Sequence, residues 1–136
     1  MTTQESSELD QHTFFAGLML ALRLRRDQFT AEGQPFHRAF LAVVDRAQED
    51  QGVQLRGARW IQMDPVFGVV PEANEMLLEA EHDRVLAFMN PRLKIARFTI
   101  EKAEADRELK QLAPEATEWF MRLGAFFDEQ LETATA

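Results

Sequence analysis

The amino-acid sequence predicts a mostly α-helical fold. It would be one domain over residues 1–136, a bundle of about five helices with an irregular or short β-hairpin segment at residues 52–70. Apolar residues recur at spacings of three and four in five separate stretches. Prolines stand where several of these stretches begin, and glycines gather in residues 52–70. The alternative is an α+β fold with strands near residues 58–70 and 92–100.

The first two helices follow from these patterns. Residues 1–8 are expected to fray, and the first helix is expected to span residues 9–28. It is apolar almost all round, which is typical of a helix in the core or at a subunit interface. Its i,i+4 series is Phe14, Leu18 and Leu22. Pro35 then opens a second helix that is expected to run to about Asp50, with Gly52 as its termination signal.

Residues 52–70 are the least regular part of the sequence. Two short strands around Asp64 and Pro65 are one interpretation of the apolar residues there. A structureless loop of this length is unusual inside a compact domain, and such loops are often functional. The apolar residues of the segment predict that it packs over the core.

Three further helices are expected in the second half. Pro71 opens a third helix to about residue 89, and Asn90-Pro91 supplies a cap and a first turn for a fourth. A strand at residues 93–100 is the rival interpretation, because several residues there favour strands. The mixed alternation of the stretch favours the helix. Pro114 begins a last, aromatic helix, and residues 133–136 are expected to fray.

The composition narrows the function classes. A formal net charge of -8 disfavours nucleic-acid binding and suits a basic protein partner. Without cysteine there is neither a disulfide framework nor a thiolate site, and no sequence motif identifies a cofactor. The longest apolar run, residues 14–22, is short of the roughly 20 residues that span a membrane. The start of the chain is polar and acidic, unlike a secretory signal, so a cytoplasmic protein is expected.

The third helix carries the most informative local pattern. Glu72, Glu75, Glu79, His82 and Asp83 share one narrow face, and two like-charged i,i+4 pairs each cost about 0.2–0.5 kcal/mol in an isolated helix. A hydrated acidic face is the simpler interpretation. The sharper hypothesis places a cation or basic partner over the face, and its metal version uses Glu75, Glu79 and His82 as ligands. The Glu-x-x-His spacing occurs once, whereas di-metal bundles need it twice.

A second cluster lies in the irregular segment. Arg56, Arg59, Trp60 and Asp64 form a candidate surface for binding a ligand or partner, because Arg and Trp are common anchors of binding hot spots. In the alternative interpretation, Trp60 fills the core and the arginines pair with the acidic third helix.

The two other histidines, His12 and His37, lie close to phenylalanines in the sequence. Histidines in that setting are more often packed or capping residues than catalysts.

The leading functional hypothesis is a non-catalytic protein-binding or regulatory protein: an adaptor, inhibitor or small chaperone. The sequence contains eleven phenylalanines, two tryptophans and six methionines. These are more bulky apolar side chains than a core of five short helices always needs. A homo-oligomer is therefore expected, most simply a homodimer. The alternative is a small-ligand or metal-binding helical bundle, a class that includes enzymes, with its site at the third helix.

Overall fold

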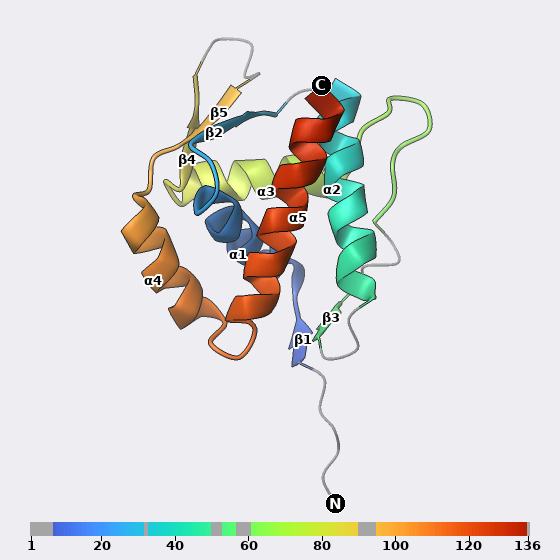
Figure 1. The fold of residues 1–136 in the computed structure, drawn as a ribbon. Coiled ribbons are helices and arrows are strands. Elements are labelled where there is room, and N and C mark those ends of the chain that lie inside the picture. Colours follow the sequence, from blue (N-terminus) through green and yellow to red (C-terminus); the bar gives the residue numbers. More distant parts are fainter. Residues whose placement is uncertain (1–6, 32, 50–52, 57–60, 90–94, 136) are drawn as a thin grey trace, which may run out of the picture.

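Helices dominate the computed structural model, which describes residues 7–31, 33–49, 53–56, 61–89 and 95–135 (Figure 1). The helices are α1 (Gln11–Arg23), α2 (Gly33–Gln48), α3 (Pro71–His82), α4 (Lys102–Leu112) and α5 (Thr117–Thr135). The strands are β1 (Ser7–Leu9), β2 (Gln28–Thr30), β3 (Val53–Leu55), β4 (Leu86–Phe88) and β5 (Ile95–Phe98). The predicted class, mostly α with a short β segment, is confirmed. None of the described helices is long and apolar enough to cross a membrane.

Helix α1 is the centre of the core. Asp10 caps its start, because the side chain accepts a hydrogen bond from the backbone N–H of Thr13 at 2.8 Å. Helices α3, α4 and α5 all pack on α1, while α2 packs on α5 (Figure 1). The prediction of a buried first helix is confirmed. Its buried side chains are Phe14, Phe15, Leu18, Met19, Leu20, Ala21 and Leu22.

Two glycines set how closely α1 and α5 approach. A Cβ atom at Gly17 would lie 2.5 Å from the ring of Phe120. One at Gly124 would lie 2.7 Å from the Cβ and 2.9 Å from the backbone carbonyl carbon of Ala21. The two helices therefore cross at a separation that only glycine permits at these positions.

The strands in the described part of the chain form two small sheets. Strands β2, β5 and β4 pair in that order, antiparallel, so that Phe29 and Phe88 both lie opposite Ala96. Strands β1 and β3 form a separate parallel pair. Within β5, Ala96 and Phe98 are buried and Arg97 is exposed, which is the alternation of a strand with one face on the core.

These strands correct the predicted helix boundaries. The first helix ends at Arg23, and residues 28–30 form β2. The third helix ends at His82, where Arg84 takes a left-handed φ of 62° and turns the chain into β4. The rival interpretation of residues 93–100 was the better one, because residues 95–98 form β5. The predicted Asn90-Pro91 helix start lies outside the described residues.

The segment after β3 packs on the core, as predicted, through the buried side chains of Ile61 and Val70. Its residues 61–70 are irregular and contain a turn, which is the first of the two predicted alternatives, and the possible strands around Asp64 and Pro65 do not form. The N–H of Val70, at the start of α3, donates a hydrogen bond to Nδ1 of His37 at 2.9 Å. This bond ties the end of the segment to α2.

Candidate functional site

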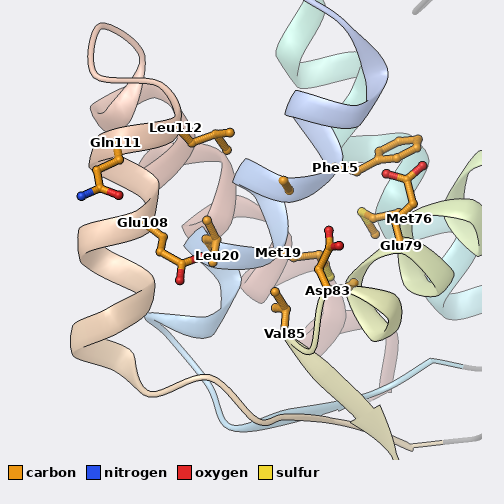
Figure 2. A pocket seen from close by; sticks show the side chains of 12 residues that line it. Phe15, Met19, Leu20, Met76, Glu79, Asp83, Val85, Glu108, Gln111 and Leu112 are labelled. Atoms are coloured by element: carbon orange, nitrogen blue, oxygen red, sulfur yellow. The ribbon is translucent and has the colours of Figure 1, made fainter.

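A cleft of about 450 Å³ opens between α1, α3 and α4, and we call it the acidic cleft. Figure 2 shows α4 on one side, α3 on the other, and Met19 and Leu20 of α1 between them. The lining residues are Phe15, Ala16, Met19, Leu20, Met76, Glu79, Ala80, Asp83, Val85, Glu108, Gln111 and Leu112. Its volume falls in the range of about 300–1,000 Å³ that is usual for ligand sites.

The floor of the acidic cleft is apolar. Its side chains are each at most 6% exposed: Phe15, Met19, Leu20, Met76 and Ala80. Two of them are methionines, whose flexible thioethers adapt to the shape of what they contact. The floor therefore offers adaptable apolar contacts to a group that enters the cleft.

The rim of the acidic cleft carries three carboxylates. Glu79 and Asp83 come from α3 and its C-terminal cap, and Glu108 comes from α4 on the opposite side (Figure 2). None of the lining residues in the described part of the chain is a lysine, arginine or histidine. The partial negative charge at a helix C-terminus makes Asp83 an unfavourable cap. The rim thus concentrates negative charge, and the residues that line the cleft supply no cation to it.

One histidine reaches the rim from the start of α1. Nδ1 of His12 lies 2.8 Å from a carboxylate oxygen of Glu79. The hydrogen bond and charge of Glu79 raise the pKa of His12, and Asp10 and Glu75 add to the rise. The His12 side chain is 79% exposed and that of Glu79 is 32% exposed, so solvent screens the pair. A positively charged hydrogen-bond donor from solvent or from a partner can therefore reach Glu79.

The structure divides the acidic face that the sequence predicts. Glu79 and Asp83 line the acidic cleft, whereas Glu75 and His82 are exposed and do not line it. Among the described residues, no three His, Asp or Glu side chains come together in a way that could hold a metal ion. Glu75, Glu79 and His82 are therefore not gathered into a metal site.

The predicted recognition cluster is only partly described. Arg59 and Trp60 lie outside the described residues. Arg56 is exposed, and its backbone N–H donates to the carbonyl of Leu9 at 2.9 Å. Asp64 has a structural role, because its Oδ1 accepts hydrogen bonds from two backbone N–H groups of the turn that follows it.

That turn presents two apolar side chains to solvent. Asp64 Oδ1 accepts from the N–H groups of Val66 at 2.7 Å and Phe67 at 3.2 Å. Gly68 closes the turn with a φ of 68° and donates to the Asp64 carbonyl at 2.8 Å. Val66 and Phe67 are 79% and 76% exposed.

His37 has a packing role, as predicted. The residue is 3% exposed, and its ring makes an edge contact with Phe36 at 5.4 Å between centroids. Burial lowers the pKa of His37. The Val70 N–H needs a ring nitrogen without hydrogen as its acceptor, so Nδ1 carries no proton in this arrangement.

Glu108 is the rim residue that the sequence patterns missed. Its neighbour Leu109 belongs to the apolar stripe that holds α4 against α1, and that packing brings Glu108 to the cleft. The stripe is visible in the sequence, but the helix on which it packs is not.

No family model, curated protein or solved structure matches the chain.

Proposed function

We propose that this chain is a non-catalytic protein-binding or regulatory protein, such as an adaptor, inhibitor or small chaperone. In this proposal, the acidic cleft receives part of a protein partner. The observation that carries the proposal is the combination of an apolar, methionine-lined floor with a rim of three carboxylates. The net charge of -8 supports it, because long-range attraction brings a basic partner to an acidic surface.

Self-association is a further outcome that this proposal allows, but the aromatic residues do not argue for it. The large aromatic side chains that suggested an oligomer fill the core of the single chain instead: Phe14, Phe15, Phe36, Phe40, Trp119, Phe120 and Phe127. Light scattering at micromolar concentration decides whether the chain also forms a homodimer.

A second candidate function is small-ligand binding at the same cleft. The volume of about 450 Å³ favours it, because drug-sized molecules occupy cavities of about this size. Native mass spectrometry of protein purified gently from its own host separates the two candidates. A bound small molecule favours the second candidate, and a protein complex favours the first.

The experiment that tests the leading proposal blocks the acidic cleft. Ala16 lines the cleft on α1 and is partly exposed, so Ala16→Phe fills the cleft without displacing a core side chain. Ala103→Phe on the exposed side of α4 is the matched control. Partners are captured from the host with each variant and compared by quantitative mass spectrometry.

We expect a partner that the unmodified chain and Ala103→Phe retain and that Ala16→Phe loses. Equal capture by all three chains would show that partners dock elsewhere, and the proposal for the acidic cleft would then be wrong. Circular dichroism of each variant checks that the helices are intact.

A further inference from the structure

We propose that the acidic cleft receives one lysine or arginine side chain of a protein partner. Its methylene stem would lie on the apolar floor, and its cationic head would lie at the rim, beside Glu79 and Asp83 and on the side that faces Glu108. The inference rests on the proposed function of the cleft as a protein-docking site, and it adds the chemistry of the occupant.

The lining of the acidic cleft matches an amphipathic side chain. Its floor, which includes Met19 and Met76, is apolar, and its rim is acidic. Lysine and arginine place an apolar stem below a charged head, which matches an apolar floor below a charged rim.

The charge of the rim selects the head group. Glu79 and Asp83 are one helical turn apart on α3, and Glu108 faces them from α4 (Figure 2). Asp83 also caps the negative end of the helix dipole. The i,i+4 spacing of Glu79 and Asp83 and the cap position of Asp83 are both unfavourable, and an ammonium or guanidinium group bound beside Asp83 relieves both.

The contact of His12 shows that a carboxylate of the rim can accept a hydrogen bond from a group that carries positive charge. Its ring is the group that already contacts Glu79, at 2.8 Å, from outside the set of lining residues. A partner's cation competes with His12 for this carboxylate. Removing the imidazole is therefore expected to strengthen binding, an effect that loss of folding cannot produce.

The test uses a fluorescently labelled helical peptide of alanine and leucine with one central lysine as the probe. A matched series replaces that lysine with ornithine, diaminobutyrate and diaminopropionate, which shortens the stem by one methylene at each step. Binding to the full chain is measured by fluorescence anisotropy. We expect the affinity to fall about fourfold per methylene, the ratio that corresponds to about 0.8 kcal/mol for each buried CH₂. A probe with glutamine in place of lysine should bind most weakly.

Variants of the chain test the rim. Asp83→Asn and Glu108→Gln should each weaken the lysine probe by about twofold to fivefold, as expected for partly screened charge pairs. Glu81→Gln is the matched control, because Glu81 is an exposed carboxylate on α3 that does not line the cleft. His12→Gln should tighten binding of the lysine probe near pH 6, where protonated His12 competes most strongly.

Each result has one meaning. Equal affinity along the stem series would overturn the inference, because a general acidic surface attracts every ammonium alike. If the glutamine probe binds as well as the lysine probe, and Ala16→Phe abolishes both, the cleft docks an apolar segment; the inference then fails and the proposed function stands. If no probe binds and Ala16→Phe captures the same partners as the unmodified chain, both fail. Tight binding of free alkylamines without any peptide preference would assign the cleft to a small ligand.

Discussion

The buried ring of His37 predicts an acid-sensitive fold, and the sign follows from its contacts. In the folded chain, Nδ1 accepts the Val70 N–H and the ring is 3% exposed. Burial lowers the pKa of His37 below its ordinary value of about 6.5. When the chain unfolds, the ring meets water and binds a proton at its ordinary pKa. The unfolded state therefore binds more protons than the folded state between the two pKa values.

The magnitude follows from linkage. Stability from His37 is fully present above about pH 6.5 and is lost as the pH falls toward the lowered pKa of the folded chain. Where the unfolded ring is protonated and the folded ring is not, the free energy of unfolding changes by up to about 1.4 kcal/mol per pH unit. The Val70 N–H adds to the effect, because protonation of Nδ1 removes its acceptor and leaves a buried donor unpaired.

The assay is urea unfolding of the unmodified chain and of His37→Asn between about pH 5 and 7.5, which brackets the ordinary histidine pKa. Asparagine keeps an acceptor oxygen close to the position of Nδ1 but does not titrate. We expect a smaller pH slope in the variant below about pH 6.5, whatever its absolute stability. Carboxylates titrate in both proteins, so the difference between the slopes isolates His37.

Identical slopes would refute the reasoning. If His37→Asn is too unstable to measure, titration of the ring protons of His37 by NMR in the unmodified chain gives the same answer, and a pKa at or above about 6.5 would refute it. His12→Gln is the control of opposite sign. Because Glu79 raises the pKa of His12, that pair stabilises the fold below about pH 6.5 and is lost as the pH rises through the raised value.

Three further predictions concern stability. Gly124→Ala gains up to about 1 kcal/mol of helix propensity, but its Cβ meets the backbone of Ala21 at 2.9 Å, so we expect a net loss of about 1–2 kcal/mol in urea unfolding. A gain would show that α1 and α5 separate easily. Asp83→Asn removes repulsion with Glu79 and with the helix dipole, and thermal unfolding should show a gain of about 0.3–1 kcal/mol; a loss would mean that Asp83 has a stabilising partner. Asp64→Ala removes the acceptor of two turn N–H groups and should cost about 0.5–2 kcal/mol, with faster amide exchange confined to the turn; unchanged exchange would count against that role.

The sequence predicts helix α2 well because every local signal there agrees. Pro35 fits a first turn, and Phe36, Phe40 and Val44 recur at four-residue spacing. All three are buried in α2, which runs from residue 33 to residue 48 against the predicted 35 to 50. Where propensity, periodicity and end signals coincide, tertiary packing has little left to decide.

The strands were harder to predict because their stability is not local. Strand β5 has four residues, too few for a period of two to be told from a helical period. It exists because β2 and β4 pair with it on either side, and β2 is far away in the sequence. The same applies to residues 28–30, where a strand that pairs with β5 begins at the predicted end of the first helix. Neither partner can be identified from a window of neighbouring residues.

The sequence predicted the part of the site that lies on one helix, but not the part that depends on how the helices pack together. Glu79 and Asp83 lie one turn apart at the end of one helix, and their i,i+4 spacing alone predicts that they are neighbours. Glu108 comes from a helix whose position against α1 depends on tertiary packing, which local sequence patterns do not show.

The acidic face of α3 allows two interpretations, a hydrated surface or a binding site for a cation or basic partner. A hydrated face predicts that all of its carboxylates are exposed to water in the same way, and Glu75 fits that description. Glu79 does not, since it is partly buried at a cleft with an apolar floor, next to a second carboxylate at the unfavourable end of the same helix. Solubility is served by acidic residues anywhere on the surface, so it gives no reason to place them at this cleft. Recognition of a cation does give that reason, because a charge that is costly in the free chain is the one that a cationic partner relieves most.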